Sequence, residues 1–247
     1  MGLRITDVVK NLLIINILMF VGSNVLTSSE IFDANRMLAL YYPNSPLFQP
    51  YQIVTHFFMH GGFTHILFNM FALVMFGSPL EALWGGKKFL FFYFFSALGA
   101  VALSFGIHYF EYAHFLSQLT PEQIQLFAKE GYDALSKGYN YENGSLAELN
   151  LKYYSYNYVP MVGASGAIFG LLLAFGMKFP NVELMLIFLP IPIKAKYFIP
   201  ILMVFELTLG IAQFSWDNIA HFAHLGGALF GFLLILYWRK FDSGFQH

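Results

Sequence analysis

The sequence predicts an all-α, polytopic membrane protein: a bundle of six transmembrane helices that forms one domain over residues 1–247. Two observations carry this prediction. Of the residues, 57% are hydrophobic and 11% are charged, whereas an ordinary soluble domain is about a quarter charged. Six apolar stretches also approach the ~20 residues that a helix needs to cross about 30 Å of hydrocarbon while satisfying its own backbone hydrogen bonds. They are residues 8–27, 63–82, 89–110, 163–179, 197–213 and 219–238.

Basic residues predict the orientation of these spans. With six crossings, most of them fall on one side of the membrane: Arg4, Lys10, Lys87, Lys88, Lys178, Lys194, Lys196, Arg239 and Lys240. The opposite side has much longer loops but only Arg36 and a few dispersed lysines. Because cytoplasmic loops are rich in Lys and Arg, we expect both termini in the cytoplasm. The expected location is the bacterial inner (cytoplasmic) membrane.

The segments between the spans give further expectations. No A-x-A-like cleavage site follows the first span, so we expect a retained helix rather than a signal peptide. Residues 28–55 and 111–158 form long outer loops. The second contains residues 120–123 (TPEQ), a capping-box pattern that predicts a short helix. Residues 183–196 are apolar but interrupted by prolines, and we expect a loop at the cytoplasmic surface.

The composition limits the chemistry. The chain has no cysteine, which rules out disulfides and thiolate chemistry. Its net charge of −1 gives no basis for binding nucleic acid. Nothing in the sequence calls for a metal or an organic cofactor. Ionisable groups inside a membrane are costly, so those that occur there are read first as functional.

Three spans carry such polar residues. Ser165 opens the fourth span between glycines, and His224 lies in the sixth. Serine and histidine are the two groups that nucleophilic acyl transfer needs. In the second span, His65 and Asn69 are four residues apart and project from one helical face.

Glycines indicate how the serine and the histidine can meet. Gly166 and Gly170 form a small-x-x-x-small edge in the fourth span, and Gly227 and Gly231 form another in the sixth. Such edges let helix backbones approach closely. A Ser–His pair requires that approach, because the serine oxygen must come within about 3 Å of an imidazole nitrogen. The sequence therefore predicts that the fourth and sixth spans pack together.

Acyl transfer also needs hydrogen-bond donors aimed at the developing oxyanion. The side chains of His65 and Asn69 can both donate. The backbone N–H of Ser165 can donate too, because it lies at a helix N-terminus, the positive end of the helix dipole.

Other interpretations stay open at this point. A serine in a membrane helix is commonly a packing residue, and the G-x-S-x-G elbow is not met because Ala167 replaces the second glycine. The spacings of His56 with His60, and of His221 with His224, suit metal binding. Against that interpretation, no H-E-x-x-H motif occurs and no carboxylate cluster joins the histidine pairs.

Glu206 is the one acid that the sequence places deep in a span. It is either a satisfied structural group or a group that handles protons. We favour the structural interpretation.

Three motifs in order, on the second, fourth and sixth spans, resemble the rhomboid intramembrane serine proteases. They are residues 60–70 (HGGFTHILFNM), 163–166 (GASG) and 223–231 (AHLGGALFG). The resemblance covers most of the chain and corresponds to the basic six-helix bacterial form, with no seventh helix or soluble appendage expected.

The resemblance implies a role for each matching residue. Ser165 would be the nucleophile, and His224 the general base and then the acid that protonates the leaving amine. His224 is preferred to His221 because it begins H-x-x-G-x-x-x-G. His65 and Asn69 would form the oxyanion hole with the Ser165 amide.

The resemblance also implies supporting residues. Gly163 belongs to the G-x-S-G loop, Gly227 to the histidine motif, and Phe169 would stack on the His224 ring. His60 and Glu81 fall at positions of further supporting residues.

The chain departs from the family pattern in its outer segments. The Trp-Arg pair that many members carry in the first outer loop is absent, and Arg36 stands without a tryptophan. The 111–158 loop is longer than in compact members. Residues 214–216 (FSW) lie where they would cap the site opening.

A mechanism follows from these roles. No acid is expected beside His224, so we expect a Ser–His dyad rather than a triad. The expected substrate is a transmembrane segment of another membrane protein, cut near its outer end, where helix-breaking residues unwind it. Two alternatives are a catalytically inactive relative that acts as a membrane-protein chaperone, and a metal-dependent membrane enzyme or transporter. The sequence does not indicate the oligomeric state.

Overall fold

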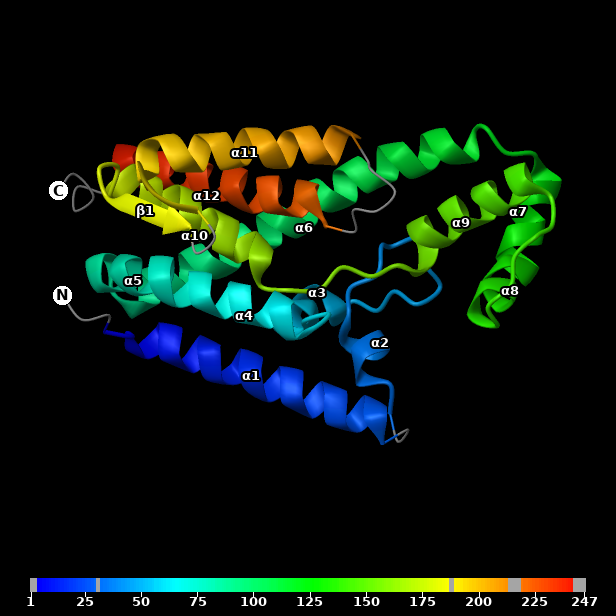
Figure 1. Ribbon diagram of the computed structural model, residues 1–247, viewed down its shortest axis with the longest axis horizontal. Helices are drawn as coiled ribbons and strands as arrows, with labels where there is room; N and C mark the ends of the chain where they lie inside the picture. The colour runs from blue at the N-terminus through cyan, green and yellow to red at the C-terminus, as the bar shows by residue number, and fades with distance from the viewer. Residues whose placement is uncertain (1–3, 30–31, 187–188, 213–218, 242–247) are drawn as a thin grey trace.

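The computed structural model describes residues 4–29, 32–186, 189–212 and 219–241. Within these ranges, apolar helices lie side by side along the long axis of the molecule (Figure 1). They are α1 (Asp7–Ser28), α4 (Phe63–Ala72) continued by η2 (Leu73–Gly77) and α5 (Ser78–Trp84), α6 (Gly86–Leu116), α10 (Ser165–Lys178), α11 (Ala195–Ala212) and α12 (His221–Phe241). The chain is an all-α polytopic bundle, as the sequence predicts.

Five of the six predicted spans are long and apolar enough to cross a membrane, the second as the continuous run Phe63–Trp84. The chain is therefore an integral, multi-pass membrane protein. The exception is α10, which has 14 residues, or about 21 Å at 1.5 Å per residue. The predicted span 163–179 begins two residues too early, because Gly163 has a φ of 118°, outside the helical range.

Helices α6, α10 and α12 pack most extensively against one another and form the centre of the bundle. Glycines make this packing possible. A Cβ atom added to Gly227 would overlap the backbone of Gly166, and one added to Gly231 would lie 3.2 Å from the Cα of Gly170. The predicted glycine contact between the fourth and sixth spans is thus confirmed.

The loop 28–55 contains two short helices, α2 (Ala34–Leu38) and α3 (Gln52–Thr55), and is followed by η1 (His56–Phe58). The guanidinium of Arg36 lies 5.5 Å from the ring centroid of Tyr132. A cation over an aromatic face is attracted by the ring quadrupole, so this contact ties α2 to the second outer segment.

The second outer segment forms a distinct lobe at the far end of α6, beyond the ends of α4, α10, α11 and α12 (Figure 1). This outer lobe consists of α7 (Pro121–Leu126), η3 (Phe127–Gly131), α8 (Tyr132–Ser136) and α9 (Gly144–Tyr158). The predicted capping box at Thr120 is present. Four buried residues give the lobe a small core of its own: Phe115, Leu119, Phe127 and Tyr153. Phe115 belongs to α6, which extends beyond its predicted end at residue 110 to reach the lobe.

The expected loop over residues 183–196 is instead an antiparallel hairpin of β1 (Glu183–Leu186) and β2 (Leu189–Lys194), in which Glu183 pairs with Lys194. Prolines at 190 and 192 argue against a central strand, but each strand of a two-stranded sheet is an edge, where proline is tolerated. The hairpin, the start of α1 and the end of α12 lie at the same end of the bundle (Figure 1).

Candidate active site

Ser165 is the first residue of α10, and the segment before it is fixed by the first outer loop. Met161 and Leu40 exchange backbone hydrogen bonds of 2.7 and 3.0 Å, and the N–H of Gly163 donates to the carbonyl of His56 at 2.9 Å. The positive φ of Gly163 then turns the chain into the helix. Helix α10, with 14 residues, is about 10 Å shorter than a hydrocarbon layer of about 30 Å.

The histidine of the sixth span meets this serine. Nε2 of His224 is 3.0 Å from the Ser165 hydroxyl oxygen. The ring of Phe169, one turn along α10, stacks on the imidazole with ring centroids 4.1 Å apart and planes 6° from parallel. The structure therefore brings the predicted nucleophile, base and stacking residue together.

A carboxylate lies on the other side of His224, and this corrects the expectation that no acid would be found there. Oε2 of Glu206, on α11, is 2.9 Å from Nδ1 of His224 and 2.7 Å from Nδ1 of His221. Glu206 is 7% exposed. Sequence reasoning missed the contact because the register of α11 against α12 cannot be read from either helix alone.

One signal could have found this contact. An acid deep in an apolar span needs a partner, and the α12 histidines are the partners at the matching depth. Gly210 of α11 lets the helices meet: a Cβ added there would lie 3.1 Å from the Cβ of His221.

His65 borders the space beside Ser165. A Cβ added to Gly163 would lie 2.8 Å from Nε2 of His65 and 3.7 Å from the serine oxygen. The backbone N–H of Gly61 donates to Nδ1 of His65 at 3.4 Å. A neutral imidazole with an accepting Nδ1 carries its hydrogen on Nε2, so the nitrogen beside Gly163 is a donor. Asn69 is buried one turn further along the same helix.

His60 packs edge-on against the His65 ring, with centroids 5.1 Å apart. Burial, followed by the proximity of His65, lowers the pKa of His60 to about 4. Neither of its ring nitrogens has a hydrogen-bond partner among the residues that the structure describes. It therefore supports His65 by packing as a neutral ring.

Glu81, a residue of α5, lies away from the candidate catalytic residues and beside the first turn of α1. Its carboxylate accepts hydrogen bonds from the N–H groups of Val8 and Val9 at 3.0 and 2.9 Å and from the Thr6 hydroxyl. It satisfies backbone donors that the first turn of a helix leaves open. Glu81 thus attaches α1 to α5, and it contacts none of the candidate catalytic residues.

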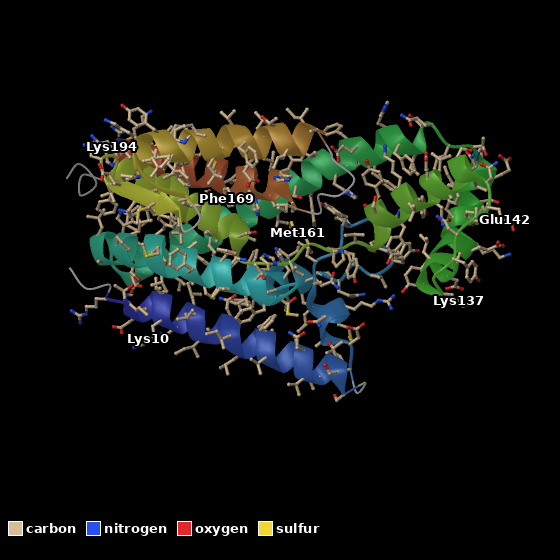
Figure 2. All side chains as sticks on the ribbon, viewed as in Figure 1. Lys10, Lys137, Glu142, Met161, Phe169 and Lys194 are labelled. Atoms are coloured by element: carbon tan, nitrogen blue, oxygen red, sulfur yellow. The ribbon has the colours of Figure 1, made fainter. Side chains whose placement is uncertain are left out.

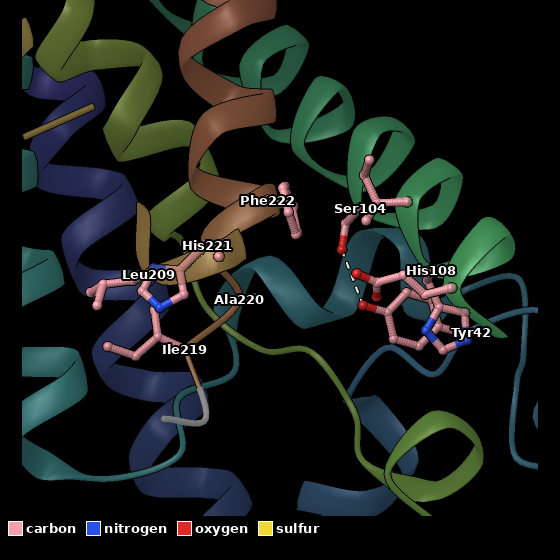
Figure 3. A pocket seen from close by; sticks show the side chains of 11 residues that line it. Tyr42, Ser104, His108, Leu209, Ile219, Ala220, His221 and Phe222 are labelled. Carbon is pink, nitrogen blue, oxygen red and sulfur yellow. Dashed lines mark hydrogen bonds between the residues drawn. The ribbon is translucent and has the colours of Figure 1, made fainter. Parts of the chain in front are cut away.

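A cavity of about 240 Å³ opens beside His221, between α6 and the facing ends of α11 and α12 (Figure 3). Ser104, His108 and Glu111 of α6 line the opposite wall, and the Tyr42 hydroxyl lies 3.1 Å from the Ser104 oxygen. The residues expected to cap the opening, 214–216, lie outside the described residues.

Glu206, His221 and His224 also satisfy a geometric requirement for metal binding. One ligand atom from each lies within 4.8 Å of the other two, and imidazole and carboxylate are common zinc ligands. The argument that no carboxylate joins the histidine pairs is therefore wrong for His221 and His224. In the structure, both Nδ1 atoms are directed at one carboxylate oxygen and Nε2 of His224 at the serine.

Known proteins resemble the chain over most of its length. Rhomboid protein 1, mitochondrial, of Saccharomyces cerevisiae is 26% identical over 188 residues, which are 76% of this chain and 42% of that protein. Presenilin-associated rhomboid-like protein A, mitochondrial, of Danio rerio is 27% identical over 213 residues, 83% of this chain and 44% of that protein. The rat protein of similar name is 39% identical over 84 residues, 34% of this chain and 22% of its own length. The chain thus spans less than half the length of these relatives.

The family model described as the rhomboid domain matches residues 47–117 and 138–241. The match includes all three sequence motifs, and its gap coincides with α7, η3 and α8 of the outer lobe. With the helical bundle, the match shows that the chain belongs to the rhomboid family.

Proposed function

We propose that the protein is an intramembrane serine endopeptidase that cleaves peptide bonds in or next to transmembrane segments. The observation that carries the proposal is the 3.0 Å contact between the Ser165 oxygen and Nε2 of His224. Two residues 59 positions apart meet in the geometry of a nucleophile and its general base. Family membership alone would leave the chemistry open.

In the proposed reaction the Ser165 oxygen attacks the scissile carbonyl carbon while Nε2 of His224 takes the hydroxyl proton. The developing oxyanion accepts hydrogen bonds from the Ser165 N–H, from Nε2–H of His65 and from the Asn69 amide. The C–N bond then breaks, and His224 gives its proton to the leaving amine. Water attacks the resulting ester with His224 again as base, which releases the acid product and restores the serine.

The depth of Ser165 limits the substrate. With the C-terminal end of α10 at the cytoplasmic boundary, its 14 residues would leave Ser165 about 10 Å below the outer boundary of the hydrocarbon. At that depth the serine can reach a peptide bond only where the substrate helix is unwound. A transmembrane segment of another protein that carries helix-weakening residues near its outer end fits this requirement.

The proposed membrane is a bacterial inner membrane, with both termini in the cytoplasm. Support comes from the basic residues at one end of the bundle, where Lys10 and Lys194 lie (Figure 2). All three relatives described above carry the word mitochondrial in their names, and these names do not support a bacterial location. Reporter fusions at residue 241 and in the outer lobe test the orientation: activity of a periplasmic reporter at residue 241 would contradict it.

The enzyme is tested by reconstituting it in detergent with a labelled transmembrane substrate and a fluorophosphonate probe. Cleavage and labelling are expected for the wild type and for Ser155→Ala, an exposed serine on α9. Both are expected to vanish in Ser165→Ala and His224→Ala. Activity that survives His224→Ala but is lost in His221→Ala would show that the other histidine is the base.

A metal-dependent enzyme is the second candidate, because Glu206, His221 and His224 form a potential ligand set. Chelator-sensitive cleavage that survives Ser165→Ala would favour it. A third candidate, an inactive relative that binds membrane helices, predicts no labelling of any variant together with retained binding of the substrate segment.

A further inference from the structure

The buried acid Glu206 contacts two histidines of the neighbouring helix through a single oxygen. Its Oε2 lies 2.9 Å from Nδ1 of His224 and 2.7 Å from Nδ1 of His221. The three side chains are buried or nearly so, with 9%, 12% and 5% of the side-chain surface exposed for Glu206, His224 and His221. Removing a carboxylate from water is costly unless hydrogen bonds replace the solvent. These two contacts provide that replacement.

The contact selects one tautomer of His224. An ionised carboxylate only accepts hydrogen bonds, so Nδ1 of His224 must carry a hydrogen. In the neutral ring Nε2 then has its lone pair, and that nitrogen is 3.0 Å from the Ser165 oxygen. A general base needs this arrangement, because the opposite tautomer would present an N–H to the serine and could not take its proton.

The contact with Glu206 also fixes the orientation of the His224 ring and stabilises the positive charge that the ring acquires during the reaction. Phe169 restrains the face of the imidazole by stacking, but stacking also allows the ring flipped by 180° about its Cβ–Cγ bond, which exchanges Nδ1 with Cδ2. The hydrogen bond to Glu206 removes that freedom. Once His224 has taken the serine proton, its positive charge lies beside a carboxylate in a water-poor site, where the attraction is much stronger than in water.

We propose that Glu206 is a positioning residue that completes a Ser165–His224–Glu206 triad, with His221 holding the carboxylate oxygen in place. The inference rests on the proposed serine peptidase activity. Within the described ranges, the titratable side chains that contact Glu206 are His221 and His224 of α12. His221 also lines the cavity beside α6, so the hydrogen-bonded series from Ser165 through His224 and Glu206 to His221 ends at that cavity.

The first test compares Glu206→Gln and Glu206→Asp with the wild type and with Glu148→Gln, an exposed acid on α9. Glu206→Gln is expected to lower kcat about 100-fold or more at little-changed KM, because the amide can present N–H groups to Nδ1 and favour the wrong tautomer. Glu206→Asp is expected to recover part of kcat. Glu148→Gln is expected to behave as the wild type.

A second measurement needs no variant at Glu206. In protein labelled with ¹⁵N-histidine, the His224 signals, assigned by their loss in His224→Ala, are expected to show a protonated Nδ1 and an unprotonated Nε2 at neutral pH. The opposite tautomer would overturn the proposal even if Glu206→Gln failed to fold.

The outcomes separate this proposal from the proposed function. A wild type that neither cleaves nor reacts with the fluorophosphonate overturns the peptidase itself. An active wild type whose Glu206→Gln variant keeps kcat within about threefold overturns only the triad, since positioning by a triad acid is worth orders of magnitude. Wild-type cleavage that a chelator abolishes and Zn²⁺ restores would identify Glu206, His221 and His224 as metal ligands and also overturn the triad.

Discussion

At the scale of single residues, the candidate active site is built around the imidazole of His224, which contacts a different side chain at each nitrogen and on its face. His224 meets the Ser165 oxygen at Nε2, the Glu206 carboxylate at Nδ1 and the Phe169 ring on its face. Three helices, α10, α11 and α12, supply these contacts. Because each side chain contacts a different part of the imidazole, replacing them one at a time should have separate effects on the reaction.

Replacing Phe169 tests the face contact. Phe169→Ala is expected to lower kcat/KM about tenfold, since an aromatic pair contributes about 0.5–1.5 kcal/mol beyond its buried area. Phe169→Tyr keeps the stacked ring and is expected to stay near the wild-type value. Phe205→Ala, at an exposed position of α11, is the control. Wild-type kcat/KM in Phe169→Ala would show that the stacking does not position the base.

The histidines outside the spans predict a dependence of stability on pH. Burial lowers the pKa values of His56 and His60 to about 4, from an ordinary value of 6.5. As the pH falls below 6.5, the unfolded chain binds protons that the folded protein does not, so folding is disfavoured. We therefore expect the thermal midpoint to be highest above pH 6.5 and to fall as the pH drops toward 4.

Thermal unfolding in detergent across this pH range checks the expectation. His60→Phe removes one titrating group and should make the decline shallower, whatever its effect on the midpoint at pH 7. His114→Gln, at an exposed position of α6, should leave the slope unchanged. An equal slope in His60→Phe and the wild type would show that His60 is protonated alike in both states.

At the scale of elements, the contact between α10 and α12 sets the distance from serine to histidine. Gly227→Ala is expected to abolish folding or to lower the thermal midpoint strongly, with loss of labelling at Ser165, because the added methyl would overlap the backbone of Gly166. Gly106→Ala is the matched control: this glycine is also helical, and a Cβ there meets nothing within 4 Å. Alanine should stabilise that helix slightly. A stable, labelled Gly227→Ala variant would contradict the close packing.

The contacts between elements were predictable from the sequence only in part. The glycine spacings were sufficient to predict that spans four and six meet, and the family resemblance predicted that Phe169 lies with Ser165 and His224. The partner of Glu206 was not predictable, because it depends on the register of two apolar helices that no local pattern fixes. The hairpin at 183–194 was missed for a different reason: its prolines disfavour a central strand, but both strands of a two-stranded sheet are edge strands, where proline is tolerated.

At the scale of the whole molecule, the residues that the structure describes form two separate hydrophobic cores. The core of the bundle lies among the spans, whereas the outer lobe is built around Phe115, Leu119, Phe127 and Tyr153. Helix α9 is connected to the bundle by hydrogen bonds that do not involve α7 or α8. Asn44 donates to the Asn157 side chain at 2.9 Å, and the oxygen of Asn44 lies 3.1 Å from Nε2 of His108. The family match likewise resumes at residue 138, before α9.

Replacing residues 118–137 by a short Gly-Ser linker should therefore leave the catalytic site intact. We expect fluorophosphonate labelling of Ser165 within about threefold of the wild type, since the deleted helices pack on a hydrophobic core that is separate from that of the bundle. The thermal midpoint should fall modestly, because Tyr153 loses its contact with Phe127. A Ser165→Ala form of the shortened protein is the negative control. A folded deletion variant that no longer reacts would instead assign α7 and α8 a direct part in shaping the site.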